Sequence, residues 1–520
     1  MTELDRRTLL RAGFAAGAAL AVPTVGRAPS ASAQAPALVR RDRPVLTHGV
    51  QSGDVTARTA TVWSRADRPS RLLVEVSPDP SFRRSRTLRG PVVTPDSDGT
   101  GRLLLRGLRP DSEVHYRVRA VDLDGRAASA PVAGSLRTAP QSRRDVRFCW
   151  SGDIAGQGWG VNEEYGGFRA AAALRDLDPD FFLCSGDTVY ADGPLAEQVT
   201  LPDGRVWRNV VTPEKSKVAE TLDEFRGQYK YNLLAENWRD FLAHTPQVNQ
   251  WDDHEVINNW YPGEILEDAR YTEKRVDVLA ARAGQAFREY VPIEGRRGDA
   301  SGRIYRVVPY GPLVDVFVLD MRTHKDPNGA NDSTVPADGV LGREQTDWLK
   351  RELRRSRAVW KVIAADLPIG LVVPDGAAME GIAQGHHGTP LGREFEVAEI
   401  LTFLKRQGIR NHVWLTTDVH YTAAHHYAPE RAAYTDFDAF WELVSGPLNA
   451  GGFGPNALDS TFGPEAVFVS TPPRPNTSPA EGHQYVGEIA VEGGSGVLTA
   501  RLRGVGGEVL WSTDLAPRRR

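Results

Sequence analysis

The stretch FFLCSGDTVYAD, residues 181–192, decides the fold. Three apolar residues at its start are followed by Ser-Gly and then Asp187, and Tyr190 lies three residues further on. A short apolar run that stops at Gly predicts a buried strand. A carboxylate at the carboxyl end of such a strand lies where open α/β sheets bind their ligands. The stretch therefore predicts a sheet edge that bears a functional site.

Four other apolar runs end in the same way. The acidic and imidazole residues at their ends are Asp153 in RFCWSGD (147–153), Asp252, Asp253 and His254 in VNQWDDHE (248–255), Asp366 in KVIAADLP (361–368), and Asp418 and His420 in HVWLTTDVH (412–420). A single Asp after a strand is usually a helix cap or a turn residue. The joint occurrence of such residues after several strands instead predicts a metal site at one edge of a sheet.

Length, charge and cysteine content limit the classes of protein. The chain has 520 residues, enough for two or three domains. Its net charge of -4 gives no electrostatic argument for binding nucleic acid or an anionic membrane, so no nucleic-acid-specific binding is predicted. Cys149 and Cys184 both lie in strand-like runs, which favours buried free thiols. A disulfide between neighbouring strands stays open for an exported protein.

The N-terminus, residues 1–34, reads as a twin-arginine signal peptide. Arg6 and Arg7 precede an Ala-rich apolar run over 12–25, and Ala-Ser-Ala at 31–33 fits a cleavage site. The alternative is a membrane anchor, but about 14 mildly apolar residues fall short of the roughly 20 that a span needs. We therefore expect a secreted or periplasmic protein that meets the twin-arginine translocase and is not an integral membrane protein.

Two domains are expected after the signal peptide. Residues 44–139 show short strands and turns, and LRGLRPDSEVHYRVRAV (105–121) resembles the fibronectin-type β-sandwich. From 145 to 520 strand-like and helical patterns alternate, which predicts an α/β, layered sheet core with C-terminal β-strands. Helices are expected over 166–177, 221–245, 271–290, 343–356 and 394–407, and strands over 314–320, 361–366, 411–416 and within 487–515.

The composition of residues 447–479, rich in Gly, Pro, Asn and Ser, predicts a long surface loop. Four histidines without strand-end spacing are expected in loops or on the surface: His386, His387, His425 and His426.

The residue types at the strand ends suit a hard to borderline metal ion. A tyrosine phenolate favours a strongly polarising ion such as Fe³⁺, although Tyr190 by itself is also typical of a half-buried aromatic. His254 lies next to a candidate ligand, Asp253, where it could protonate a leaving-group oxygen as a general acid. Two ions about 3.5–4 Å apart could hold a phosphate between its attacking and leaving oxygens.

The order of these motifs resembles the calcineurin-like metallophosphoesterases, and more closely the PhoD-type alkaline phosphatase/phosphodiesterase family. The resemblance runs from about residue 45 to near the C-terminus and includes the sandwich. The segments that bear it are GVQSGDVTARTATVWSRA (49–66), CSGDTVYADGP (184–194), QWDDHEVINNW (250–260), VFVLDMRTHK (316–325) and LTTDVHYTAA (415–424).

The resemblance implies a ligand set. Asp153 and Tyr190 would bind a first metal, Asp187 would bridge two, and Asp253 stands where the wider superfamily has Asn. The remaining departures are Asp366 in place of a His before Pro, and Asp418 with His420 in place of a His-x-His pair. Asp in these positions shifts the second site toward calcium and away from zinc.

The cofactors implied are therefore Fe(3+) and Ca(2+) in a dinuclear or larger cluster, with Zn and Mn as the weaker alternatives. Some PhoD-type members use a cysteine as an iron ligand. We expect Asp153 rather than Cys149, because Asp153 lies at the strand end.

Two further sets of side chains belong to the predicted site. Arg322 is a candidate for holding a phosphate oxygen bidentately, and a salt bridge to a neighbouring Asp is the equal alternative. Asn258 and Asn259 could orient their loop or complete a calcium shell.

The function expected from the resemblance is that of a secreted metal-dependent phosphoesterase, in which a metal-activated hydroxide attacks phosphate monoesters or diesters. The alternatives are a phospholipase D-like or teichoic-acid-type phosphodiesterase on the same scaffold, and a non-enzymatic metal-binding surface protein.

Overall fold

Strand β9 (Phe181–Ser185) forms at the start of the stretch 181–192, and every residue in it is buried. It pairs in parallel with β8 (Val146–Ser151) and with β12 (Gln247–Gln250). The structure is a computed structural model that describes residues 43–294, 302–337 and 339–518. Because both faces of β9 are covered, its sequence is a nearly continuous apolar run rather than an alternating one, whereas β12 is buried although three of its four residues are Gln or Asn.

These strands belong to a nine-stranded sheet within the described ranges, in the order β24-β23-β22-β8-β9-β12-β1-β2-β5. β1 pairs in parallel with β12, so strands from the N-terminal region extend the central sheet. The bounds of the other members are β1 (Leu46–Gly53), β2 (Thr59–Ala66), β5 (Thr100–Arg106), β22 (Tyr485–Val491), β23 (Leu498–Gly504) and β24 (Val509–Leu515).

The N-terminal region is completed by a second, four-stranded sheet in the order β4-β3-β6-β7. Its strands are β3 (Ser70–Ser77), β4 (Arg86–Val93), β6 (Glu113–Asp122) and β7 (Val132–Arg137). Val62, Val74 and Tyr116 belong to the apolar cluster formed by the two sheets. The expected sandwich is confirmed, and one of its sheets is shared with the rest of the chain.

A seven-stranded sheet, counted over the described residues, has the order β13-β14-β15-β18-β20-β19-β21. β14, β15, β18 and β20 run parallel. The bounds are β13 (Arg306–Tyr310), β14 (Val314–Val318), β15 (Trp360–Ala364), β18 (His412–Thr416), β19 (Thr422–Tyr427), β20 (Phe440–Val444) and β21 (Pro464–Ser470).

Two expectations for this region were wrong. Residues 447–479 include the strand β21, which pairs with β19 and begins at a proline. An edge strand tolerates proline at its first position, so the composition of the segment hid the strand. His425 is buried in β19 rather than exposed, and its Nδ1 lies 3.3 Å from Glu442 Oε2. The carboxylate of a neighbouring strand satisfies the ring, and no sequence spacing indicates that contact.

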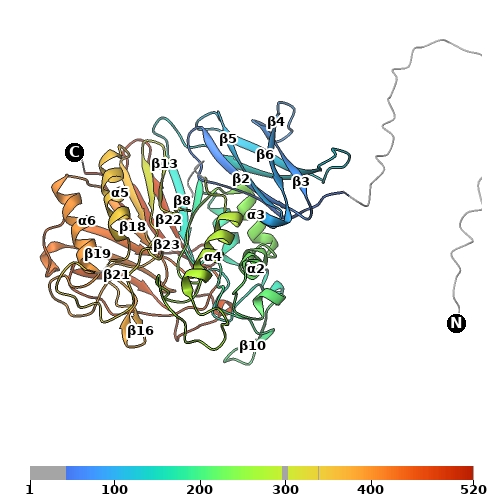
Figure 1. Cartoon of the computed structure of the whole chain (residues 1–520). Coiled ribbons are helices and arrows are strands. Elements are labelled where there is room, and N and C mark those ends of the chain that lie inside the picture. Colours follow the sequence, from blue (N-terminus) through green and yellow to red (C-terminus); the bar gives the residue numbers. More distant parts are fainter. Residues whose placement is uncertain (1–42, 295–301, 338, 519–520) are drawn as a thin grey trace, which may run out of the picture. The chain divides into compact units, whose positions relative to one another are not determined.

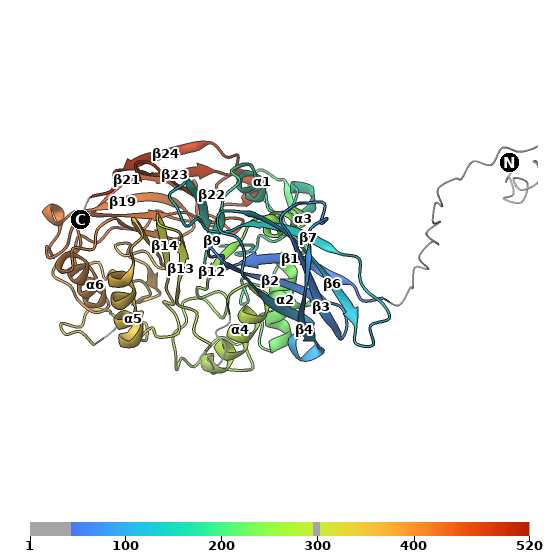
Figure 2. The ribbon, with the colours of Figure 1, turned by 90° about the horizontal axis from the view of Figure 1, so that it is seen from above.

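The two large sheets pack face to face, and helices cover their outer faces (Figure 1). Phe148 and Phe181 of one sheet and Val316 and Val362 of the other share one apolar cluster. Figure 2 shows α5 and α6 on the side away from the N-terminal sheets. The helices are α1 (Ala170–Asp176), α2 (Leu222–Asn232), α3 (Glu236–His244), α4 (Val276–Tyr290), α5 (Gly342–Arg355) and α6 (Glu394–Arg406). This layered α/β arrangement confirms the predicted fold class.

The helical pattern over 221–245 is divided into α2 and α3. A capping box between Thr221 and Glu224 starts α2, and the helix ends before Leu233. Two short hairpins complete the described strands: β10 (Gln198–Thr200) with β11 (Val206–Arg208), and β16 (Pro374–Asp375) with β17 (Ala378–Met379). No helix among the described residues is long and apolar enough to cross a membrane. The predicted signal peptide, 1–34, lies outside the described residues.

Candidate metal centre

The carboxyl ends of strands from both large sheets supply the candidate ligands. Asp153, Asp187 and Asp253 follow β8, β9 and β12 of the nine-stranded sheet. Asp366 follows β15, and Asp418 follows β18, in the seven-stranded sheet. The two sheets face one another, so their strand ends meet and residues far apart in the chain become neighbours. We expected one sheet edge, and the structure uses two.

The backbone at this edge is unusual. Asp153, Asp187, Asp418 and His420 adopt φ angles of 59°, 45°, 68° and 59°. Positive φ is uncommon for residues other than glycine and clusters at functional sites, where packing must hold it. In each case the left-handed residue lies just beyond a strand end, so the chain turns sharply there.

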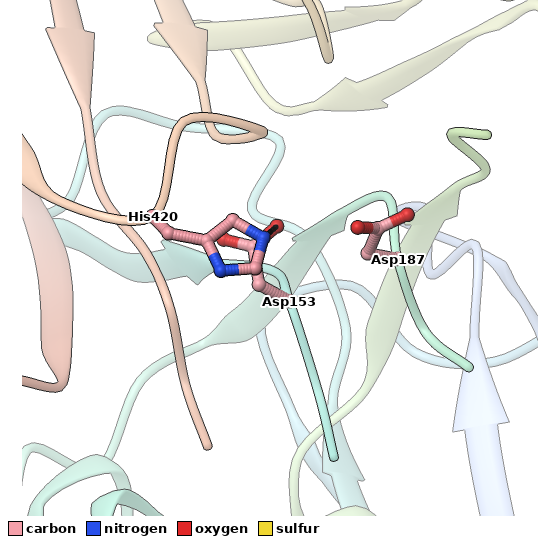
Figure 3. A group of neighbouring side chains, drawn as sticks. All are labelled: Asp153, Asp187 and His420. Carbon is pink, nitrogen blue, oxygen red and sulfur yellow. Dashed lines mark ion pairs between the residues drawn. The ribbon is translucent and has the colours of Figure 1, made fainter. Parts of the chain in front are cut away.

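Three sets of acidic and imidazole side chains place one possible ligand atom each within 4.8 Å of one another. Asp153, Asp187 and His420 form what we call the first group (Figure 3). Asp252, Asp253 and Asp418 form the second group. The set Asp187, Asp253 and His254 joins the two. Asp187 and Asp253 therefore each belong to two sets, as residues between two adjacent ions would.

Neutral donors accompany the acids of the first group. The Tyr190 hydroxyl lies 2.8 Å from Nε2 of His420, and that nitrogen lies 3.7 Å from Oδ1 of Asp153. The Nδ1 of His420 donates to the Gly451 carbonyl at 2.5 Å, which leaves Nε2 as the unprotonated nitrogen. Burial lowers the pKa of His420 to about 4, so the ring is neutral and competent as a ligand at ordinary pH.

The acids of the second group, together with the neighbouring Asp366 and Glu380, surround the guanidinium of Arg322. Nε of Arg322 donates to Oδ1 of Asp252 at 2.6 Å, and Nη1 bonds the Glu380 carboxylate. Asp366 and Asp418 lie 3.4 and 3.6 Å from the same guanidinium. Arg322 is fully buried. This arrangement matches the salt-bridge alternative for Arg322, and contact with a phosphate stays a prediction.

Buried carboxylate oxygens without a hydrogen-bond partner provide the test of whether a cation fits. Among the described residues, those close to the two groups are both oxygens of Asp153, Oδ2 of Asp252, Oδ2 of Asp366 and Oε2 of Glu380, and Glu264 and Glu394 each have one such oxygen elsewhere. Buried polar atoms are almost always satisfied, and buried charges are paired or coordinate metals. The chemistry of the donors therefore fits metal ions at this position.

The charge balance supports the same conclusion. Burial, together with neighbouring carboxylates, raises the pKa of Asp153, Asp187 and Asp418 well above the ordinary value. Asp253 differs: burial opposes its ionisation, but Arg322 and His254 outweigh burial and lower its pKa to about 2. Cations between such acids stabilise the ionised forms that their burial disfavours.

His254 is held by a carboxylate that we did not predict. Its Nδ1 lies 2.7 Å from Oδ1 of Asp192. Its ring packs against the ring of Tyr190, with the two ring centroids 4.2 Å apart. Burial lowers the pKa of the imidazole, but Asp192 outweighs burial and raises the pKa to about 9. The contact with Asp192 therefore favours the protonated ring of His254, which has a proton to donate.

Several contributors to the site were missed. Glu255 accepts hydrogen bonds from the backbone N–H groups of Thr188 and Asp252, which joins the turns after β9 and β12. Asp192 and Glu255 lie within the family motifs 184–194 and 250–260, so the sequence could have indicated them as site residues. Glu380 and Gly446 lie in loops outside these motifs, and the sequence does not indicate them. A Cβ on Gly446 would be 2.0 Å from Oδ2 of Asp153, so only glycine leaves room for that carboxylate.

The two cysteines lie apart from these groups. Cys149 and Cys184 are buried, unpaired thiols in the apolar cluster under the helices of the nine-stranded sheet. Burial raises the pKa of both thiols. Asp153, and not Cys149, lies among the candidate ligands.

Comparisons with known proteins identify the family of the chain. The model of the PhoD-like phosphatase family matches residues 148–502, and the model of the PhoD-like phosphatase N-terminal domain matches residues 31–140. Alkaline phosphatase D of Bacillus subtilis (strain 168) is 27% identical over 440 residues, which cover 79% of this chain and 70% of that protein.

Two solved structures have the same fold. The structure of PhoD has a TM-score of 0.68 at 22% identity, covering 91% of this chain and 89% of that one. A purple acid phosphatase from seeds of yellow lupin (Lupinus luteus) has a TM-score of 0.56 at 13% identity, covering 91% and 74%. The family models together span the sandwich and both large sheets except for β24. The chain belongs to the PhoD-like phosphatase family and is a phosphoric ester hydrolase.

Proposed function

We propose that the protein hydrolyses phosphate monoesters or diesters with a cluster of Fe³⁺ and Ca²⁺. The observation on which this depends is the pair of adjoining ligand groups, in which both oxygens of Asp153 and Oδ2 of Asp252 are buried without a hydrogen-bond partner among the described residues. Asp153, Asp187, Tyr190 and His420 would hold Fe³⁺, because a phenolate and a carboxylate suit a strongly polarising ion. The second site would be bounded by Asp187 and by the acids Asp253, Asp366 and Asp418, and oxygen ligands suit Ca²⁺.

The side chains and the ions have separate tasks in this proposal. When bound, the ions supply positive charge that polarises the phosphoryl oxygens and lowers the pKa of water to yield the nucleophile. His254 keeps a proton on its ring, held in place by Asp192, and donates it to the leaving-group oxygen. The enclosed acids and the buried Arg322 keep bulk water from screening these charges.

The cell would export the protein through the twin-arginine pathway. The support is the Arg6-Arg7 pair, the apolar run and the Ala-Ser-Ala site within residues 1–34. The twin-arginine translocase, which exports folded proteins, would let the cluster load before export. Fusing residues 1–40 to a reporter tests this: export should stop when both arginines are replaced by lysine.

Kinetics with a chromogenic phosphate monoester and the matching diester test the activity. We expect turnover of at least one ester, loss of turnover in EDTA, and recovery on adding Ca²⁺ alone. Metal analysis of the chelated protein should still find iron. An enzyme that keeps full activity after all metal is removed, or that contains neither iron nor calcium, would contradict the proposal.

A further inference from the structure

The hairpin formed by β16 and β17 connects two loops that border the second group. Asp375 of the hairpin is half-buried, and its two carboxylate oxygens accept from different amides. Oδ1 accepts from Nδ2 of Asn259 at 3.1 Å, and Oδ2 accepts from Nδ2 of Asn328 at 2.9 Å. Asn259 follows β12, and Asn328 follows β14. One side chain therefore ties together loops from the two large sheets.

Asn259 is restrained through its backbone as well as its side chain. Its N–H donates to Oδ2 of Asp253, and its carbonyl accepts from Nδ2 of Asn328 at 2.8 Å. Its φ of 59° lies in the left-handed region, which Asn adopts more readily than most residues. With its N–H, its carbonyl and its amide all engaged, Asn259 has little freedom to move relative to Asp253.

The position of Asp253 matters because it belongs to two of the three ligand sets. One of its oxygens is committed to the Asn259 N–H, so rotation of the carboxylate is restricted. A metal ligand has to be held within about 0.5 Å of its working position by groups that are themselves fixed. Asn328 is fixed in turn, since its Oδ1 accepts from Lys325 and, at 3.2 Å, from Nη2 of Arg393.

We propose that Asp375 is a positioning residue for the second group and acts on Asp253 through Asn259. The inference rests on the proposed metal dependence. Partners of metal ligands typically change metal affinity about 10- to 100-fold when they are replaced. Asp375→Ala should therefore weaken Ca²⁺ binding by about that factor, whereas the iron content stays that of the wild type, because the first group has no contact with Asp375.

The test uses the full-length holoenzyme after removal of exchangeable metal with EDTA. The midpoint of thermal unfolding is followed as Ca²⁺ is added, and iron content is measured on the same samples. Asp375→Ala should need about 10- to 100-fold more Ca²⁺ for half of the full stabilisation. Asp375→Asn should fall between, since its amide offers one acceptor oxygen where two donors are present. Pro374→Ala, in the same hairpin, is the matched control and should behave as wild type.

A second variant covers the case in which Asp375→Ala does not fold. Asn328→Ala removes one hydrogen bond to Asp375 and one to the Asn259 carbonyl, so it should shift the Ca²⁺ requirement in the same direction. Wild-type Ca²⁺ dependence in these variants would overturn the positioning role. Equal loss of iron and Ca²⁺ would overturn it too, because the site as a whole would then have collapsed. A wild-type protein without any response to Ca²⁺ would instead contradict the proposed function.

Discussion

The first and second groups differ in how the protein balances their charge. Within the described residues, neither Asp153 nor Asp187 forms an ion pair with Lys or Arg. The acids of the second group, in contrast, lie 2.5 to 4.0 Å from the guanidinium of Arg322. Buried carboxylates without an internal cation depend more strongly on a bound ion.

This difference predicts unequal metal retention. The first group should hold a highly charged ion tightly, because no Lys or Arg among the described residues pairs with Asp153 or Asp187. The second group is already partly neutralised, so it should bind a divalent ion more weakly and exchange it. Tightly held iron beside removable calcium is the pattern that the charge balance favours.

The largest effect is expected where the two groups join. Asp187→Asn should reduce kcat/KM by about 10³-fold or more, equivalent to at least about 4 kcal/mol, because both ions lose a shared ligand. In protein stripped of both kinds of ion, stability should not fall, since one of several repelling buried carboxylates has become neutral. Steady-state kinetics and thermal unfolding measure both. Asp315→Asn is the control and should retain activity. Asp315 is a buried acid in β14 that accepts a hydrogen bond from the Ser356 hydroxyl. Wild-type turnover in Asp187→Asn with metals bound would rule out the bridging role.

The second effect concerns the internal cation. Removing one partner of a buried ion pair costs about 3–5 kcal/mol, so Arg322→Met should lower the free energy of unfolding by about that amount in EDTA. Added Ca²⁺ should recover part of this loss, because a cation then faces the same acids. Chemical denaturation with and without Ca²⁺ measures the difference. If Arg322 instead holds phosphate, the substitution should raise KM and leave stability near that of the wild type.

A smaller effect is expected from the phenol of the first group. Tyr190→Phe should remove the visible charge-transfer absorption of a phenolate bound to Fe³⁺ and lower iron affinity about 10- to 100-fold. The response of the protein to Ca²⁺ should change little, because Tyr190 has no contact with the second group. Absorption spectra and iron analysis check this. Tyr229→Phe is the matched control, a buried phenol whose hydroxyl has no hydrogen-bond partner in the part of the chain that the structure describes. An unchanged spectrum in Tyr190→Phe would place the iron elsewhere.

The sequence predicted the strands and their ends well, for a physical reason. A parallel strand covered on both faces usually has a nearly continuous apolar run, as β9 does, and the chain turns where that run stops. Asp153, Asp187 and Asp418 were therefore visible as acids at the ends of such runs. The pattern did not reveal that two sheets, rather than one, bring these ends together, because periodicity reports burial and not the partner sheet.

Residues that act through contacts between distant segments could not be predicted. Asp375 follows the apolar residues 371–374 and lies in the short strand β16, and Glu380 follows β17. Their roles arise from contacts with distant parts of the chain, which the local sequence does not show. Gly446 is needed because of the space occupied by Asp153, which only coordinates reveal. The two readings of Arg322 could not be separated either, since an arginine after a strand has the same local sequence whether it binds phosphate or an aspartate.

The smallest effect separates burial from metal binding. Glu394, at the start of α6, is a buried acid away from both groups, and burial raises its pKa to about 7. The folded state then binds more protons than the unfolded state between about pH 4.5 and 7. Stability from this group is complete below about pH 4.5 and is lost as pH rises toward 7. Glu394→Gln should remove that loss and stabilise the protein at pH 8 relative to pH 5.

The expected gain for Glu394→Gln is about 1 kcal/mol after allowing for relaxation of the protein around the ionised carboxylate. It should be the same with and without Ca²⁺, because no cation site adjoins Glu394. Denaturation curves at the two pH values, each in EDTA and in Ca²⁺, give the comparison. A gain that depends on Ca²⁺ would mean that the acids of the metal groups and the distant acids are coupled. Glu394 could then no longer serve as an example of an acid whose ionisation is governed by burial alone, in contrast to the acids that we propose bind metal ions.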